Sequence, residues 1–172
     1  MAPTNLIERL DGELDDGGDG DQMPEVREHL SPKEDNLQVK KVILTRGLPA
    51  SGKTTWAKEQ VKMGWKRVNK DDLRAMLDNS FHNKSNEKFV LEMRDFIILH
   101  SLKQGKNVIV DDTNLNPIHE THIRDLVKHE AVVSIKDFTD VPLDTCLERD
   151  TKRCNGVGEK VIKRMYNQYI KP

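Results

Sequence analysis

From residue 39 onward, short apolar runs alternate with longer segments in which apolar residues recur every three or four positions. The short runs predict strands, and the longer segments predict helices. The expected strands are residues 41–46, 65–69, 107–111 and 131–138. The expected helices are residues 53–63, 71–77, 86–104, 117–129, 143–152 and 159–170. Strands that alternate with helices are typical of an α/β fold, so the pattern predicts a parallel sheet of four to five strands flanked by helices.

The longest expected helix, residues 86–104, is predicted from a set of side chains at helical spacing. They are Phe89, Met93, Phe96, Ile97 and His100. The chain contains no internal repeat. Its 172 residues are enough for one domain with a proper core and too few for two of comfortable size.

The first 36 residues have a different composition from the rest. The stretch DGELDDGGDGD, residues 11–21, is acidic and glycine-rich, and it cannot bury enough apolar surface to offset the entropy lost on ordering. We therefore expect residues 1–36 to form a disordered acidic tail and residues 37–172 to form the folded domain. The tail either keeps the protein in solution or mimics nucleic acid and competes for the folded domain.

The net charge of −1 conceals a strong asymmetry between these two parts. Residues 1–36 carry eleven acidic and three basic side chains, a net charge of −8. Residues 37–172 carry 18 acidic and 25 basic side chains, a net charge of +7. A basic domain is compatible with a polyanionic partner such as nucleic acid.

The composition, 35% hydrophobic and 33% charged residues, is typical of a soluble protein. No apolar run approaches the roughly 18 residues of a membrane helix, and the acidic N-terminus lacks the apolar core of a secretory signal. Cys146 and Cys154 match no common zinc spacing, so we expect reduced thiols. These features predict a cytoplasmic protein that does not interact with membranes.

A phosphate-binding motif follows the first expected strand. Residues 47–54 read GLPASGKT, which fits G-x-x-x-x-G-K-[ST]. Glycines let backbone N–H groups converge on phosphate oxygens, and the start of the next helix adds partial positive charge. Lys53 is expected to reach the β- and γ-phosphates of ATP, and Thr54 to offer its hydroxyl to Mg²⁺. The residues expected to bind the nucleotide here are Gly47, Ala50, Ser51, Gly52, Lys53, Thr54 and Thr55.

The segment VNKDDLR, residues 68–74, follows the second expected strand. Side chains just beyond the carboxyl ends of parallel strands line the ligand crevice of such sheets. One of Asp71 and Asp72 can cap the next helix, while the other can face the crevice and accept the proton of an attacking hydroxyl. The pattern does not distinguish the two. Arg74 can hold an anionic part of the acceptor; the alternative is a surface arginine.

The segment VIVDDTNLNP, residues 108–117, ends the third expected strand with two further aspartates. Asp112 is a candidate for orienting hydrated Mg²⁺ or for supporting the region of Thr54 and Arg74. Thr113 is expected to contact the substrate with it. The alternative is a loop that only caps the helix starting at Pro117.

The segment RDTKR, residues 149–153, places Arg149 and Arg153 four positions apart and hence on one helical face. Two arginines near a γ-phosphate would neutralise the charge that develops in the transition state. Gly156 and Gly158 would give the following loop freedom to close. The alternative is a solvated basic helix face.

In this order, GLPASGKTTW, NKDDLR, DDTNLNP and RDTKR resemble the kinase domain of the bacteriophage polynucleotide 5′-hydroxyl kinases, which is often fused to a C-terminal phosphatase. The resemblance covers residues 40–171. It implies a P-loop fold with a helical lid, and transfer of the γ-phosphate of ATP to 5′-hydroxyl ends of DNA or RNA. It also implies a ligase as partner in end healing, in the cytoplasm of an infected bacterial host.

The resemblance also implies roles for individual residues. Asp71, rather than Asp72, would be the general base, and Arg74 would hold the 3′-phosphate of the terminal nucleotide. Asp112 would support the site. Arg149 and Arg153 would come from the lid over the donor, with Arg153 and Lys53 joining Asp71 in catalysis.

Two other functions remain compatible with the motifs. One is a P-loop kinase that phosphorylates a small-molecule hydroxyl, and the other is a non-catalytic, ATP-gated module that binds nucleic acid. The acidic tail, the absence of a phosphatase sequence and Arg46 beside the loop depart from the family pattern. Arg46 would either contact phosphate or face solvent.

Overall fold

The computed structural model describes residues 39–80 and 84–171, so the expectations for the tail lie outside the described residues. The strands are β1 (Lys41–Arg46), β2 (Lys66–Val68), β3 (Val108–Val110) and β4 (Val132–Asp137). The helices are α1 (Lys53–Lys62), α2 (Lys70–Asp78), α3 (Lys84–Lys103), α4 (Pro117–Val127), α5 (Leu143–Thr151) and α6 (Glu159–Tyr169). Every expected strand and helix is therefore confirmed. None of the helices in the described ranges has both the length and the apolar character that crossing a membrane requires.

The four strands form one parallel sheet in the order β2-β3-β1-β4. Val108, Ile109 and Val110 of β3 are fully buried between β1 and β2, which explains why this strand reads as an uninterrupted apolar run. Because β1 and β3 are parallel neighbours, the loops that follow them leave the same edge of the sheet. The fold thus brings the phosphate-binding motif next to the aspartates after β3.

One apolar core lies between the sheet and the helices α2, α3 and α4. Strand residues such as Val42 and Leu44 pack there with Ile98 and Leu102 of α3 and with Ile123 of α4. Each of these side chains is fully buried. This core fixes the helices that follow β2 and β3 relative to the edge of the sheet where the loops gather.

The helix α3 was predicted from one set of regularly spaced side chains, but it mainly buries a different set. Phe89 is 47% exposed and Phe96 is 61% exposed, and Phe96 stacks on the exposed ring of His100. The buried side chains of α3 are Val90, Arg94, Ile98 and Leu102. Both sets recur at helical spacing, so periodicity predicted the helix correctly but could not select the face that packs on the sheet.

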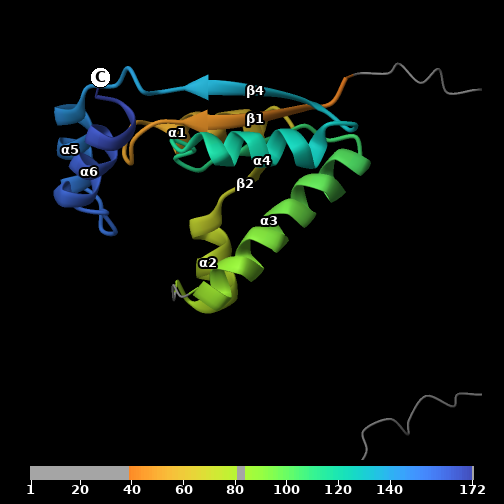
Figure 1. The fold of residues 1–172 in the computed structure, drawn as a ribbon, viewed down its shortest axis with the longest axis horizontal. Helices are drawn as coiled ribbons and strands as arrows, with labels where there is room; N and C mark the ends of the chain where they lie inside the picture. The colour runs from red at the N-terminus through yellow and green to blue at the C-terminus, as the bar shows by residue number, and fades with distance from the viewer. Residues whose placement is uncertain (1–38, 81–83, 172) are drawn as a thin grey trace, which may run out of the picture. The chain divides into compact units, whose positions relative to one another are not determined.

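A second, smaller core joins α5 and α6 to the loops of the site. Leu48 of the phosphate-binding motif and Leu115 of the loop after β3 pack with Cys146 of α5 and Ile162 of α6. Figure 1 shows the arrowheads of β1 and β4 pointing toward α5 and α6. The two C-terminal helices are thus held directly against the carboxyl edge of the sheet.

Candidate active site

The phosphate-binding motif folds around the ammonium group of Lys53. Its Nζ donates to the carbonyl oxygens of Gly47 at 3.0 Å and Leu48 at 2.6 Å, and to Oγ of Ser51 at 3.4 Å. Burial lowers the pKa of Lys53 from 10.5 to about 8, because desolvation disfavours the charged amine; Asp111 acts in the opposite direction. The lysine is therefore held within the loop that the motif predicted.

Two glycines of the motif occupy positions that favour glycine, one for lack of space and both for their positive φ. Gly47 has a φ of 151°, and a Cβ there would lie 2.9 Å from Cβ of Phe138 and 3.0 Å from its carbonyl oxygen. Gly52 has a φ of 102° and occupies the N-cap of α1, where a left-handed backbone favours glycine. The first turn of α1 leaves backbone N–H groups without intrahelical acceptors, and such groups bind phosphate.

The start of α2 separates the roles of its two aspartates. Neither of them caps the helix; Asn69 does, and its side chain accepts from the backbone N–H of Asp72 at 3.0 Å. The carboxylate of Asp72 instead accepts from Nη1 of Arg67 at 2.5 Å. The expectation that an aspartate caps this helix was therefore wrong. The N-cap position, one residue before the helix begins, is occupied by Asn69, and both aspartates lie within the first turn.

Asp71 projects from the same turn into solvent at the mouth of a cavity. Its side chain is 86% exposed and forms an ion pair with Arg74, one turn further along α2. Glu87 of α3 holds the other edge of the Arg74 guanidinium through two hydrogen bonds of 2.9 and 2.8 Å, and these bonds raise the pKa of Arg74. The arginine is therefore fixed in place and charged beside an accessible carboxylate.

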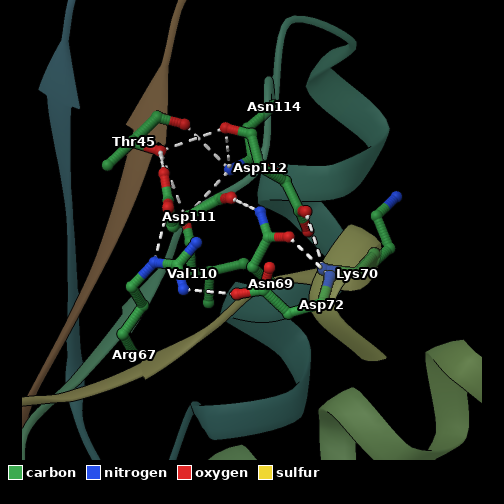
Figure 2. Close-up of polar contacts among 9 residues, drawn as sticks. All are labelled: Thr45, Arg67, Asn69, Lys70, Asp72, Val110, Asp111, Asp112 and Asn114. Atoms are coloured by element: carbon green, nitrogen blue, oxygen red, sulfur yellow. Dashed lines mark hydrogen bonds and ion pairs between the residues drawn. The ribbon is translucent and has the colours of Figure 1, made fainter. Parts of the chain in front are cut away.

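Asp111, the first residue after β3, lies in the buried network shown in Figure 2. Its side chain is fully buried and accepts from Nε of Arg67 at 2.6 Å. Arg67 therefore bridges Asp111 and Asp72. Asn69 donates to the carbonyl oxygen of Asp111, which ties the start of α2 to the end of β3.

Asp112 lines the cavity and carries one carboxylate oxygen without a partner in the described part of the chain. Its Oδ1 accepts from the backbone N–H of Lys70 at 3.1 Å, whereas Oδ2 is buried and has no hydrogen-bond partner among the described residues. Burial raises the pKa of Asp112, while Lys70 and Arg94 act in the opposite direction. An orphaned buried oxygen on a residue that lines the same cavity as Thr54 fits a bound cation or its water.

The loop after β3 is anchored mainly by Asn114. This residue has a φ of 43°, and its side-chain amide donates to the carbonyl oxygens of Thr45 at 2.8 Å and Val110 at 3.2 Å. Arg46 donates to the carbonyl oxygen of Asn114 at 3.3 Å and pairs with Glu120 at 2.5 Å. Arg46 therefore braces this loop through two protein groups, a role that was not among the two expected for it.

Arg149 and Arg153 do not share a helical face. The helix α5 ends at Thr151, so Arg149 lies within it while Arg153 lies in the loop that leads to α6. This expectation was wrong because a spacing of four positions means one face only where the helix continues. Arg153 lines the cavity, and its guanidinium forms no hydrogen bond or ion pair among the described residues.

These four segments enclose one cavity of about 360 Å³. The expected site residues on its wall are Ala50, Gly52, Lys53, Thr54, Asp71, Arg74, Asp112, Thr113 and Arg153. The wall also includes Pro49, Asn69, Lys70, Asp111, Asn155, Val157 and Met165. Four expected residues lie outside it: Gly47 and Ser51 within the loop, and the exposed Thr55 and Arg149.

Several residues that shape the site were not predicted. Asn69 had a recognisable sequence signal, since an asparagine three positions before an acid is typical of a helix N-cap. Glu87 and Arg67 had none, because each reaches its partner across a large sequence separation or between different elements. Asp150 falls within the RDTKR motif, but nothing in the pattern distinguished it from the solvated charges around it.

The lowered pKa of Lys53 predicts that ATP binding weakens as the pH rises from 7.5 to 9. The neutral amine predominates above a pKa of about 8, and it attracts phosphate less than the ammonium does. At one unit above this pKa only about a tenth of the lysine is protonated, so Kd should rise by up to about tenfold. Equilibrium titrations with ATP test this. Lys53→Arg, which stays charged, should flatten the profile, and a constant wild-type Kd would contradict the expectation.

The family model AAA_33, described as an AAA domain, matches residues 42–172. A predicted bifunctional polynucleotide kinase/RNA ligase of Autographa californica nuclear polyhedrosis virus is 30% identical, over 77% of this chain and 21% of its own. An L-seryl-tRNA(Sec) kinase of Methanococcus maripaludis is 28% identical, over 76% of this chain and 53% of its own.

Among solved structures, the Pnkp1/Rnl/Hen1 RNA repair complex contains a chain that is 29% identical, with a TM-score of 0.69. That match covers 81% of this chain and 47% of the other. The chain thus spans from a fifth to about half the length of the curated relatives it matches. The viral relative confirms the resemblance to polynucleotide kinases that the four motifs carry. Because the family model covers nearly all of the described domain, the chain belongs to the AAA_33 family of AAA domains.

Proposed function

We propose that this domain transfers the γ-phosphate of ATP to the 5′-hydroxyl end of a polynucleotide. The observation that carries the proposal is the shared cavity: Lys53 and Thr54 line one part of its wall, and the paired Asp71 and Arg74 line another. A phosphoryl donor and a hydroxyl acceptor can thus meet in one cavity. The viral relative, named for a polynucleotide kinase, supports this choice of acceptor.

The donor side of the reaction would use the phosphate-binding loop. Backbone N–H groups at the start of α1 and the ammonium of Lys53 would hold the β- and γ-phosphates. Arg153 lines the same cavity with a guanidinium that is unpaired among the described residues, so it can approach the transferring phosphate. Positive charge placed there stabilises the transition state, in which negative charge spreads over the phosphoryl oxygens.

Mg²⁺ would be held by Thr54 and by water bound to Asp112. The described residues contain no cluster of three or more His, Cys, Asp or Glu side chains able to hold a metal ion by themselves. This suits Mg²⁺, which commonly takes one or two protein ligands and completes its shell with phosphate oxygens and water. When bound, the ion would neutralise negative charge on the donor phosphates.

On the acceptor side, Asp71 would act as the general base. The 5′-oxygen attacks the γ-phosphorus, its proton passes to the Asp71 carboxylate, and the bond from the γ-phosphorus to the β–γ bridging oxygen breaks to release ADP. Asp71 suits this role because its carboxylate is accessible at the cavity mouth. Asp72 is less suited, because it is not among the residues that line the cavity, whereas Asp71 is.

A nucleic-acid acceptor also fits the charge of the domain. Residues 37–172 carry a net charge of +7, which favours a polyanion in a manner weakened by salt. The viral relative is named as a kinase and RNA ligase together, and the solved repair complex contains Rnl and Hen1 as well. We therefore propose that a ligase consumes the 5′-phosphate end that this domain produces.

Arg74→Ala should raise the KM for oligonucleotides far more than the KM for nucleosides. The arginine is fixed by Glu87 next to the base, where it can bind the phosphate on the 3′ side of the terminal nucleoside. A hydrogen bond to a charged group is worth about 1.5–3 kcal/mol, which corresponds to roughly 10- to 150-fold in KM. Steady-state kinetics on a 5′-hydroxyl oligonucleotide and on the matching nucleoside test this, and equal changes for both would contradict phosphate contact.

The central experiment is transfer of labelled γ-phosphate from ATP in the presence of Mg²⁺. A 5′-hydroxyl oligonucleotide, the same oligonucleotide with a 5′-phosphate, and a nucleoside mixture are offered in parallel. Label on the 5′-hydroxyl oligonucleotide alone is expected. No label on any oligonucleotide, with ATP still bound, would refute the proposed acceptor.

The archaeal relative motivates a second acceptor. It is named as a kinase of L-seryl-tRNA(Sec), whose acceptor is a hydroxyl on an aminoacyl group. Seryl-tRNA is therefore included as a further arm of the assay. Label on this substrate but not on the 5′-hydroxyl oligonucleotide would replace the first proposal with this one.

A further inference from the structure

Asp150 is a buried carboxylate for which the proposed reaction has no direct use. It lies one residue before the end of α5 and is only 4% exposed. Its Oδ1 accepts from the backbone N–H of Val157 at 3.2 Å, and its Oδ2 from that of Gly158 at 2.8 Å. Both oxygens thus bind the far end of the loop that joins α5 to α6.

The same loop closes on Asp150 from two further directions. The backbone N–H of Arg153 donates to the carbonyl oxygen of Asp150 at 3.1 Å. A Cβ at Gly156 would lie 2.6 Å from that carbonyl oxygen and 2.9 Å from Oδ2, so only glycine fits there. The loop therefore contacts Asp150 through three backbone N–H groups, two of which bind the carboxylate, and through the close approach of Gly156.

Helix stability does not explain this carboxylate. A negative charge in the last turn of a helix opposes the helix dipole, which favours cations at that end. Burial of an aspartate is also unfavourable unless its oxygens are satisfied by donors. The two N–H groups of Val157 and Gly158 provide those donors, so the arrangement serves the loop rather than α5.

The loop delivers side chains to the cavity. Arg153, Asn155 and Val157 all line the wall that also holds Lys53 and Asp71. The helix that starts the loop is itself fixed against the phosphate-binding motif, because Cys146 packs in one cluster with Leu48. Asp150 thus connects a helix that is fixed by packing to the loop that carries Arg153.

We propose that Asp150 is a positioning residue for phosphoryl transfer, because its carboxylate holds the α5–α6 loop in the shape that directs Arg153 at the donor phosphates. This inference rests on the proposed function. Without the carboxylate, a loop with glycines at 156 and 158 would sample many conformations. Displacement of a charge-stabilising group by about 1 Å can lower a catalytic rate by about 10²-fold.

The first measurement is amide hydrogen exchange on the full chain, with Asp150→Ala compared with wild type. Exchange at Val157 and Gly158 should accelerate at least about tenfold, because their N–H groups lose their acceptors. Asp144→Ala, at an exposed aspartate in the first turn of the same helix, is the matched control and should leave both amides unchanged. Unchanged exchange in Asp150→Ala would overturn the inference whatever the activity.

The second measurement is a double-mutant cycle with Arg153→Ala. Asp150→Ala should lower kcat by about 10- to 100-fold and leave the Kd of ATP within about threefold. If Asp150 acts through Arg153, adding Asp150→Ala to Arg153→Ala should lower kcat by no more than about twofold further. Independent effects that multiply, or a wild-type kcat in Asp150→Ala, would overturn the role.

A second variant provides an independent test if Asp150→Ala does not fold. Gly156→Ala leaves the aspartate in place but pushes the loop away from it, and Gly156 lies outside both helices. It should reproduce the loss of kcat and the faster exchange, and wild-type values for both would count against the inference. If wild type phosphorylates no acceptor, the proposed function fails, whereas the exchange data still decide whether Asp150 holds the loop.

Discussion

Asp71→Asn is expected to lower kcat for 5′-hydroxyl oligonucleotides by about 10²- to 10⁴-fold and to leave ATP binding unchanged. Asparagine keeps the size of the side chain but cannot accept the proton of the attacking hydroxyl. The carboxylate is 86% exposed at the mouth of the cavity and pairs with Arg74 rather than with the phosphate-binding loop. Donor affinity should therefore not depend on it. Pre-steady-state transfer and equilibrium ATP titration on the same preparation measure the two quantities.

The matched control is the neighbouring aspartate. Asp72→Asn makes the same chemical change one residue away, where the carboxylate pairs with Arg67 at 2.5 Å. Asp72 itself is largely exposed, lies outside the cavity lining, and leaves Arg67 its ion pair with Asp111, so kcat should stay within about fivefold of wild type. If Asp71→Asn keeps more than a tenth of wild-type kcat, or if Asp72→Asn is the more damaging change, Asp71 is not the base.

Lys53→Met is the second change with a large expected effect, a loss of about 10²- to 10³-fold in kcat. The methionine fills a similar volume but removes the one cation that the motif places inside the loop. Lys53 is 7% exposed and makes hydrogen bonds to two loop carbonyl groups, so the variant also tests whether the loop keeps its shape. Single-turnover transfer at saturating ATP separates the chemical step from donor binding.

Lys58→Met is its matched control, since it removes an exposed lysine from the same helix one turn further on. Its kcat and melting temperature should match those of wild type. A drop in melting temperature for Lys53→Met without a loss of transfer would mean that the lysine supports only the loop. Comparable losses of kcat in both variants would mean that general positive charge, and not a placed cation, promotes transfer.

The arginines of the site fall into two groups that only the structure separates. Arg46, Arg67 and Arg74 are each held by a carboxylate from another element, which are Glu120, Asp111 and Glu87 respectively. Arg153 has no such partner among the described residues. Structural arginines brace the loops around the cavity, whereas Arg153 depends for its position on the backbone of the loop that carries it. The position of Arg153 is thus sensitive to the contacts that Asp150 makes with this loop.

The order and type of every element followed from the sequence, because strands and helices are set by short-range periodicity. The apolar run of β3 and the helical spacing in α3 both extend over consecutive residues. The phosphate-binding motif was equally readable, since its glycines and Lys53 act within eight consecutive positions. Parallel topology then followed from the alternation, and with it the expectation that residues after β1, β2 and β3 share one edge.

What the sequence did not determine depends on contacts between distant residues. Helical periodicity is satisfied equally by Phe96 and by Ile98, and only packing against the sheet decided that Ile98 is buried. The spacing of Arg149 and Arg153 predicted a shared face, but α5 ends between them, where the loop turns back onto Asp150. The sequence by itself therefore determined the elements and the phosphate-binding loop, since both are local. The tertiary structure alone decided which aspartate lines the cavity and that Arg153 is unpaired among the described residues, because those outcomes depend on groups brought together by the fold.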